Sequence, residues 1–352
     1  MSILFAILIF SFLIFIHELG HFLAAKASGV QVNEFSMFMG PAIWKKQVGE
    51  TLYSIRCIPM GGYCAMEGED EDTDNPRAFH KAVWWKRFII LIAGAAMNFI
   101  AGLVIVALLF LPSQAEYVLQ IESFENYSTL DDYGLQVGDE IIEMDGEKMY
   151  VYNDFSMILS INPGEKHDLV VLRNGEKVVL NDFTMETHTV LDDEGNEVQR
   201  YGVTFGTREL NFGGKMRLAW FTVVDWVRSV RLSLQMLISG QASFSQVSGP
   251  VGIVSQMGEM ADNSATWVDA VLNMLYFGAY IAINLSVMNL LPIPALDGGR
   301  VLALLLTTGV EAITKKKINP KYEGYIHAAG MILLLGLMAL IMFKDIFTIF
   351  KG

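Results

Sequence analysis

Two histidines and a glutamate near the start of the chain have the residue types and the spacing of a zinc protease site. His17, Glu18 and His21 form an H-E-x-x-H pattern. On an α-helix, residues at i and i+4 share one face, so both imidazoles can bind the same metal ion. Glu18 can reach a water molecule at that metal as a general base. The alternative is a pair of helical histidines beside a charge, without a metal.

The residues around this pattern favour the functional interpretation. Residues 2–16 carry no charge, and residues 22–25 continue the apolar run up to Lys26. Two histidines and a carboxylate inside a helix of membrane length are energetically costly, so such residues are functional candidates.

Two histidines alone make an incomplete site, because a catalytic zinc usually has three protein ligands and one open position. Asp297 is the one acid in residues 289–299, where Pro292 and Pro294 prevent a regular helix. This stretch and the H-E-x-x-H pattern are both expected near the cytoplasmic ends of their helices, at the same membrane depth. We therefore predict that Asp297 is the third ligand. The alternative is a capping carboxylate for a helix over residues 301–313.

The 352-residue chain is too hydrophobic for an ordinary soluble domain of this size. Hydrophobic residues make up 53% of it, and its mean hydropathy is positive. Four mainly apolar stretches are long enough to cross a membrane: residues 2–25, 88–111, 270–291 and 326–343. No basic region precedes the first stretch, so we expect a retained transmembrane helix and not a cleaved signal peptide.

Basic residues predict the orientation of these spans. Lys86 and Arg87 precede the second span, and Lys315, Lys316 and Lys317 lie between the third and the fourth. The positive-inside rule places both of these loops in the cytoplasm. Both chain termini and the segment between spans two and three are then expected outside, with the zinc site near the cytoplasmic side.

The formal net charge of −13 comes from the segment between spans two and three. Residues 113–213 hold 21 Asp and Glu but only 6 Lys and Arg. This acidic balance argues against nucleic acid or anionic lipid as the partner of that segment.

Short strands and tight turns alternate within residues 115–208. Asp145-Gly146 and Asn174-Gly175 are hairpin signals, another hairpin is expected at Glu194-Gly195, and residues 151–161 have helical spacing. This order of elements, with the run GLQVGDEIIEMDGE, resembles a circularly permuted PDZ domain. Such domains bind a peptide as an added strand. The alternative is a small β-rich spacer without a ligand.

We expect this domain to select substrates, either by excluding proteins with bulky outer domains or by capturing an exposed C-terminal tail. Residues 134–138 are the expected part of a peptide groove, because their glycines leave backbone amides open to a carboxylate.

Some features have less specific patterns. Residues 53–58 resemble a strand, and a plain hairpin turn is the simplest interpretation of Gly61-Gly62 that follow. The acidic residues 67–74 suit a solvated loop. Residues 215–238 are apolar but carry Asp225, Arg228 and Arg231, as an amphipathic helix at the outer membrane interface does, and residues 248–253 are expected to break regular structure. Asn98 is expected to form a hydrogen bond with a neighbouring helix. The more specific prediction is a contact with the helix that carries His17. No role is predicted for residues 248–253 or for the two cysteines.

Together these motifs resemble the site-2 protease family of intramembrane zinc metalloproteases. The resemblance rests on HELGH at 17–21, MGGY at 60–63, AGAAMNF at 93–99, SGPVGI at 248–253 and NLLPIPALDGG at 289–299, with the PDZ-like insert between them. It looks most like the bacterial branch that acts in regulated intramembrane proteolysis, in a form with a single PDZ domain. One departure is Gly94-Ala95, where the family commonly has Gly-Pro.

The resemblance implies a fold class. This is a polytopic α-helical membrane protein with about four transmembrane helices, a membrane-associated β-loop and an inserted extracytoplasmic PDZ-like α+β domain. The implied parts are an N-terminal membrane part (1–112), the PDZ-like domain (115–208), an amphipathic interfacial segment (214–268) and a C-terminal membrane part (269–352).

For the site, the resemblance implies Zn²⁺ bound by His17, His21 and Asp297, with Glu18 as the catalytic base. It also implies that a re-entrant β-loop holds the substrate as an added strand and that the later span helps to unwind it. The residues implied in substrate binding are Gly61, Gly62, Asn284, Asn289, Pro292 and Pro294.

The implied activity is zinc-dependent endopeptidase cleavage within the cell membrane. Its substrates would be single-span membrane proteins that are already trimmed, such as an anti-sigma factor or a signal-peptide remnant. Membrane lipid and a peptide at the PDZ-like domain are further implied partners, and nucleic acid is not. The alternatives are a PDZ-bearing membrane adaptor and a metal transporter, each with a non-proteolytic metal site. Glu18 argues against both, because neither needs a general base.

Overall fold

The computed structural model describes residues 2–351 except 70, 132, 162–165, 186, 192–196, 242–248 and 316–319. The chain forms two compact units. The helical unit comprises residues 1–106 and 230–352, and the inserted unit comprises residues 107–229. Each unit is described by itself.

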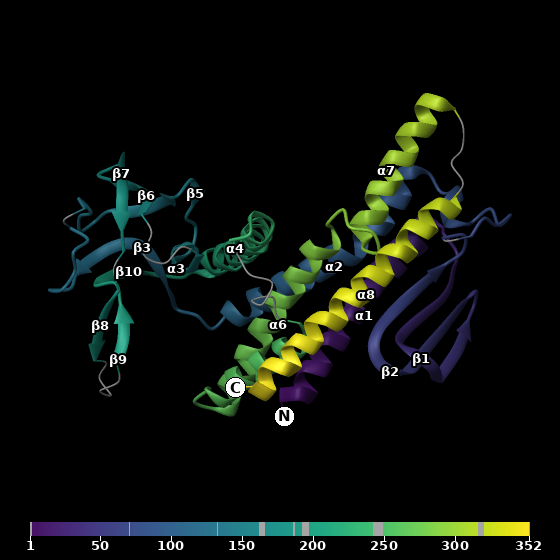
Figure 1. The fold of residues 1–352 in the computed structure, drawn as a ribbon, viewed down its shortest axis with the longest axis horizontal. Helices are drawn as coiled ribbons and strands as arrows, with labels where there is room; N and C mark the ends of the chain where they lie inside the picture. Colours follow the sequence, from purple (N-terminus) through teal and green to yellow (C-terminus); the bar gives the residue numbers. More distant parts are fainter. Residues whose placement is uncertain are drawn as a thin grey trace. The chain divides into compact units, whose positions relative to one another are not determined.

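Within the described residues, four helices are long and apolar enough to cross a membrane. They are α1 (Ser2–Ser28), α2 (Trp84–Phe110), α6 (Trp267–Asn289) and α8 (Pro320–Lys351), with candidate spans Ile3–Ser28, Trp84–Phe110, Trp267–Asn289 and Gly324–Phe347 (Figure 1). The four predicted spans are thus confirmed, and the chain is a multi-pass membrane protein. The prediction places the start of the second span at residue 88, four residues after the helix begins, because the Trp84-Trp85-Lys86-Arg87 flank is already helical.

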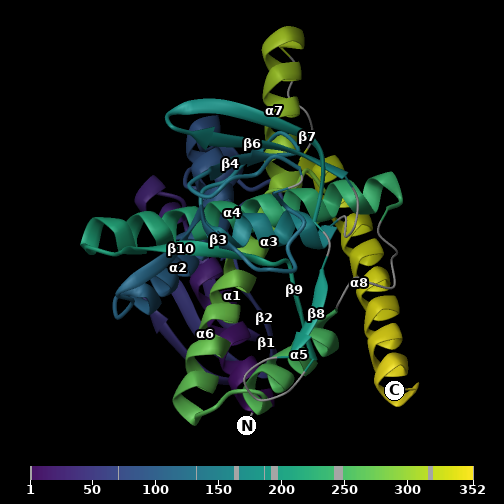
Figure 2. The same ribbon diagram turned by 90° about the vertical axis from the view of Figure 1, so that its left-hand side faces the viewer.

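Three further helices of more than ten residues lie in the described parts of the chain. They are α4 (Phe212–Ser239), α5 (Pro250–Asp262) and α7 (Asp297–Thr314). The helix predicted over 215–238 is α4, and the rest of the segment 214–268 contains α5 and the start of α6. In the helical unit α1 contacts α5 and α6, and α8 contacts α5 and α7 (Figure 2).

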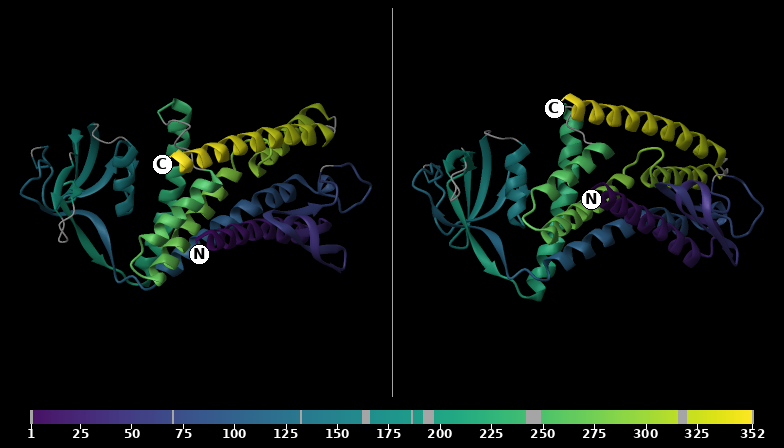
Figure 3. Two further views of the ribbon diagram at one scale, coloured as in Figure 1. Left: turned by 60° about the horizontal axis from the view of Figure 1, so that its bottom comes forward. Right: turned by 90° about the horizontal axis from the view of Figure 1, so that it is seen from below.

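The loop after α1 forms a long β-hairpin of β1 (Val32–Val48) and β2 (Thr51–Met66), beside α1 in Figure 3. The prediction of a hairpin turn at Gly61-Gly62 is wrong. Both glycines lie inside β2, and the hairpin turns at Gly49-Glu50. Phe35 of β1 pairs with Tyr53 on one side and Cys64 on the other, so the first half of β1 lies between two halves of a curled β2.

This curling leaves residues 62–66 at an edge, since their ladder partners in the described structure are all on β1. Aromatic contacts hold the hairpin to α1. The Phe35 ring lies 5.9 Å from that of Phe15 and 5.0 Å from that of Phe22.

The inserted unit is built on an antiparallel sheet with the strand order β10-β3-β4-β6-β7, and β5 pairs with β4. The strands are β3 (Ala115–Phe124), β4 (Glu140–Met144), β5 (Glu147–Lys148), β6 (Lys166–Arg173), β7 (Glu176–Thr184) and β10 (Val203–Glu209). The hairpins predicted at Asp145-Gly146 and Asn174-Gly175 are confirmed, and all four residues have positive φ. The helix predicted over 151–161 is α3 (Tyr152–Ile161).

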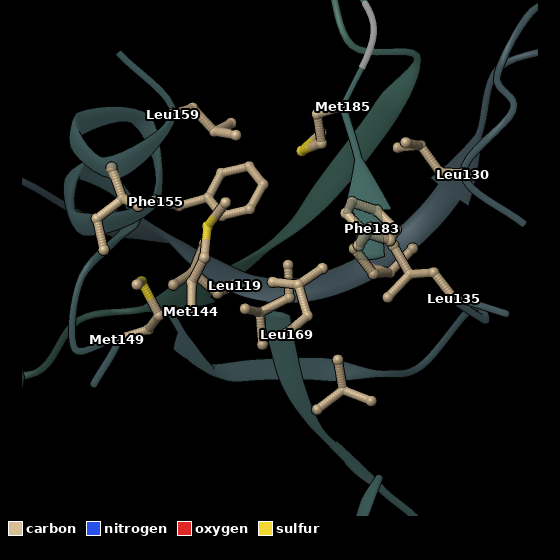
Figure 4. Packing of buried hydrophobic residues seen from close by; sticks show 14 of the residues in the cluster. Leu119, Leu130, Leu135, Met144, Met149, Phe155, Leu159, Leu169, Phe183 and Met185 are labelled. Carbon is tan, nitrogen blue, oxygen red and sulfur yellow. The ribbon is translucent and has the colours of Figure 1, made fainter. Parts of the chain in front are cut away.

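The core of the inserted unit lies between this sheet and α3 (Figure 4). Its labelled members include Leu119, Met144, Phe155, Leu169 and Phe183. A separate hairpin joins β8 (His188–Leu191) and β9 (Glu197–Arg200), and its predicted turn at 194–195 lies outside the described residues.

Candidate metal centre

Three side chains that are far apart in the sequence meet at one point of the helical unit. His17 and His21 come from α1, and Asp297 is the first residue of α7. The two Nε2 atoms are 3.2 Å apart, and Asp297 Oδ2 lies 3.2 Å from His17 Nε2 and 3.3 Å from His21 Nε2. The three donor atoms therefore form a nearly equilateral triangle.

This triangle fits a zinc ion. Tetrahedral ligands at about 2.0–2.1 Å from the metal lie about 3.3–3.4 Å from one another. Asp297 Oδ2 is buried and accepts no hydrogen bond from the described residues. A carboxylate oxygen and two imidazole nitrogens that converge without a proton donor among them are suited to a cation, and two nitrogens with one oxygen are a usual zinc donor set.

Hydrogen bonds to the remaining ring nitrogens orient the two imidazoles. His21 Nδ1 lies 2.8 Å from the carbonyl oxygen of Ile90 on α2. A carbonyl can only accept, so Nδ1 carries the proton and Nε2 is free to bind a metal. The Asn98 side-chain amide lies 3.4 Å from His17 Nδ1, which is the expected contact to the helix of His17.

The position of Asn98 is also compatible with a His17 ring that carries its proton on Nδ1. Its Oδ1 is buried without a hydrogen bond from the described residues, whereas its Nδ2 faces the ring. The oxygen and nitrogen of a side-chain amide are assigned from their hydrogen bonds. Exchanging them lets Oδ1 accept from His17 Nδ1–H, which leaves Nε2 for the metal.

Two glycines bring α1 and α2 together at this depth. A Cβ atom at Gly20 would lie 2.3 Å from the carbonyl oxygen of Ala93, and one at Gly94 would lie 2.3 Å from His21 Nε2. Sequence reasoning missed that Gly94 makes room for both histidines. The sequence signal was the run of small residues AGAA.

Asp297 is presented by an irregular loop after α6. The loop folds over the first turn of α7, where a Cβ at Gly298 would lie 2.2 Å from the Leu290 carbonyl oxygen and one at Gly299 would lie 2.2 Å from that of Ile293. The capping alternative for Asp297 has no support in the described structure, where Leu296 is the N-cap residue of α7 and no side-chain hydrogen bond is seen at this cap. Asp297 Oδ2 faces the histidines instead.

Glu18 lies between the histidines and the edge of the hairpin. The backbone amide of Cys64 donates a hydrogen bond to its carboxylate. A Cβ atom at Gly62 would be 3.2 Å from Glu18 Cγ, so β2 passes directly over this side chain. The glycine therefore permits the close approach of a strand to the predicted base.

For the other residues that were predicted to bind substrate, the described structure shows no contact with the donor atoms of the metal centre. Asn284 donates to the Tyr280 carbonyl oxygen of its own helix, and Gly61 packs against Met39 at a positive φ. Asn289 is the last residue of α6, and Pro292 and Pro294 are exposed in the loop before Asp297. Their roles in substrate binding stay predictions.

Sequence reasoning missed two residues that contact the Asp297 segment. His327 of α8 accepts a hydrogen bond from the backbone amide of Ala295. Glu69, from the acidic stretch expected to be a solvated loop, forms an ion pair with Arg300 and is only 17% exposed. A lone histidine within the fourth span was the available signal for the first residue.

Comparison with known proteins gives a consistent result. The profile of peptidase family M50 matches residues 5–337. A Clostridium perfringens protein with a provisional zinc-metalloprotease name is 33% identical over 349 residues, with 98% of both chains covered. The zinc metalloprotease RasP of Geobacillus kaustophilus is 27% identical over 425 residues, with 98% of this chain and 97% of the relative covered. The regulator of sigma-W protease RasP of Bacillus subtilis is 27% identical over 429 residues, with 98% of each chain covered.

Proposed function

Because this chain belongs to peptidase family M50 and is a zinc metalloprotease, we propose that it cleaves the transmembrane segments of single-span membrane proteins inside the membrane. Zn²⁺ is its cofactor, and this ion supplies Lewis-acid chemistry that lowers the pKa of a water molecule and polarises a peptide carbonyl. His17, His21 and Asp297 are the residues that hold it, as their triangle of donor atoms supports.

Glu18 is the proposed general base. It accepts a proton from the attacking water and returns it to the amide nitrogen that leaves. The backbone amide of Cys64 is a donor next to the carboxylate, which can still accept a proton from water. The position of Glu18 between the donor triangle and the β2 edge is the observation that carries this proposal.

The edge at residues 62–66 is the proposed substrate-binding strand. A transmembrane helix bonds its carbonyls internally, so it must unwind before cleavage. An unwound stretch can pair with a strand edge through its backbone, independently of its side chains. Because Gly62 lies against Glu18, a stretch paired there has its peptide bonds close to the base.

For the orientation, we propose that both termini and the inserted unit are extracytoplasmic and that the metal centre is near the cytoplasmic side. The basic loops on either side of this centre support the assignment through the positive-inside rule. In cells the chain would reside in the plasma membrane, where an anti-sigma factor or a signal-peptide remnant could be its substrate.

For the inserted unit, we propose a PDZ-like domain that selects substrates. The prediction that residues 134–138 form part of a peptide groove is wrong. Gly138 N–H donates to Ile121 O, and Gly134 N–H donates to Asp131 O. These amides are not open to a carboxylate. A peptide could instead add at β10, an edge of the sheet, where Phe205 packs against Phe155 of α3.

The test compares the wild-type chain with Glu18→Gln in lipid nanodiscs. Zinc content and cleavage of a synthetic transmembrane peptide with a short outer tail are measured, and Glu259→Gln on the exposed surface of α5 is the control. We expect Glu18→Gln to keep its zinc and to lose cleavage by about 10²–10⁴-fold, the range of general acid–base catalysis.

Each alternative function has its own result. Near wild-type turnover by Glu18→Gln would overturn the role of the base. A zinc-loaded wild-type chain that cleaves no transmembrane peptide would favour an adaptor, and zinc uptake into liposomes without cleavage would favour a transporter.

A further inference from the structure

The loop that presents Asp297 contains a strained residue. Ala295 has φ of +79°, a left-handed conformation that is unfavourable for a residue with a Cβ atom. Such a conformation is strained and persists only where neighbouring structure holds it. Ala295 is two residues before Asp297, so what holds Ala295 also sets the direction of the aspartate.

His327 of α8 contacts this strained residue directly. The Ala295 amide nitrogen lies 3.0 Å from His327 Nδ1. A backbone amide can only donate, so Nδ1 must be the acceptor and the ring proton must be on Nε2. The histidine is half-buried, and it lies 32 residues beyond the loop in the sequence.

A second contact fixes α8 against the same loop. A Cβ atom at Gly330, almost one helical turn after His327, would lie 2.5 Å from Pro294 Cβ and 2.8 Å from the Pro294 carbonyl carbon. The helix backbone thus packs directly on the residue before Ala295. This close packing keeps His327 within hydrogen-bond distance of the amide.

We propose that His327 is a positioning residue, which holds the loop at residues 294–297 so that Asp297 completes the metal centre. The proposal rests on the proposed ligand role of Asp297. His327 touches neither the metal nor the substrate; it acts through the Ala295 amide. The hydrogen bond keeps the strained backbone in one conformation, and Asp297 Oδ2 then stays within 3.2–3.3 Å of the two imidazole nitrogens.

The test measures how fast zinc is transferred from the intact protein in nanodiscs to a chelator. The variant His327→Leu keeps the bulk of the side chain but has no acceptor. The variant His327→Asn places an amide oxygen close to the position of Nδ1. The control is Met331→Leu, an exposed residue on the next turn of α8. We expect transfer to be about 10–100-fold faster in His327→Leu, the range seen when residues that orient metal ligands are lost. Transfer should be within about threefold of wild type in His327→Asn and unchanged in Met331→Leu.

Hydrogen exchange of the peptide that covers residues 290–297 gives a readout besides metal transfer. It should become faster in His327→Leu and stay protected in His327→Asn, because only the latter can accept from the Ala295 amide. Equal zinc transfer by wild type and His327→Leu would overturn the proposal. Equally fast transfer by both His327 variants would also overturn it, because the side chain would then matter for packing alone.

The variant Asp297→Asn separates this inference from the proposed function. If Asp297→Asn loses zinc and His327→Leu does not, the ligand assignment holds and the positioning role fails. If the wild-type chain binds no zinc, or Asp297→Asn keeps tight zinc, the ligand assignment fails first.

Discussion

Gly94 of α2 lies directly against His21 of α1, because a Cβ atom at residue 94 would be only 2.3 Å from His21 Nε2. The same atom would be 2.8 Å from His17 Cε1. The space beside both imidazoles of the proposed metal centre therefore depends on the absence of a single methyl group from the neighbouring helix.

Gly94→Ala should displace one or both imidazoles and weaken zinc binding by at least about 100-fold, beyond the usual effect of residues that only orient ligands. Zinc content after dialysis against a chelator measures this loss. Gly102→Ala is the matched control, because its Cβ would meet Ile283 and Ala279 of α6 instead of the histidines. Equal zinc loss in both variants would attribute the effect to helix packing.

Asp297→Asn should weaken zinc binding by more than about 100-fold and also stop turnover, since a neutral amide is a poorer zinc ligand than a carboxylate. Metal analysis under the same chelator challenge measures the first effect. A full complement of tightly held zinc in this variant would show that the third ligand lies elsewhere.

The inserted unit should be less stable at alkaline pH because of a buried pair of carboxyl groups. Burial, followed by the neighbouring Asp154, raises the pKa of Asp225 on α4 to about 8. Asp154 is fully buried, and Arg228 Nη1 lies 3.6 Å from it. The pKa of Asp225 is higher in the folded unit than in the unfolded chain. The contribution of this side chain to stability is therefore fully present below about pH 4 and is lost as the pH rises through 8.

Proteolysis by proteinase K within residues 107–229, compared at pH 6 and pH 9, measures this pH dependence. The wild-type chain should be cut faster at pH 9, after correction for the activity of the protease at each pH. Asp225→Asn should reduce the difference, because its side chain stays neutral. Asp168→Asn, at an exposed position, is the control. An unchanged difference in Asp225→Asn would contradict the assignment.

Asp345→Ala should destabilise the helical unit through α5. Asp345 Oδ2 accepts hydrogen bonds from Gly249 N–H at 2.9 Å and from Gly252 N–H at 3.0 Å, so α8 caps the first turn of α5. Losing a capping side chain costs about 0.5–2 kcal/mol. Thermal unfolding in nanodiscs should show a lower Tm, and Asp345→Asn should retain most of the stability. This cap gives residues 249–252 a structural role, and Gly249 lets Ile341 and Asp345 approach closely.

Local patterns were sufficient where the structure depends on neighbours in the sequence. The i, i+4 spacing of His17 and His21 sets both on one face of α1 whatever else the chain does. The Asn174-Gly175 pair determines its hairpin because it accepts positive φ at both positions. Hydropathy predicted the four long helices, since a membrane requires about 20 apolar residues in succession.

Local patterns failed where distant segments decide the backbone. Gly61-Gly62 has the residues of a turn, yet both continue β2, because β1 provides a ladder partner for Gly62 at Met37. The amides near residues 134–138 looked open, yet Ile121 O accepts from Gly138 N–H across the fold. Glu69 looked like part of a solvated acidic loop, yet it pairs with Arg300, which is 231 positions away.

By itself, then, the sequence determined the paired histidines, the glutamate beside them and the membrane helices, because each follows from spacing or composition within one segment. Only the tertiary structure decided that Asp297 meets those histidines, that Gly94 makes room for them and that His327 bonds to the loop that carries the aspartate. The physical reason is that these contacts join segments dozens to hundreds of residues apart. Helix packing and backbone hydrogen bonds set such distances, and no local pattern records them.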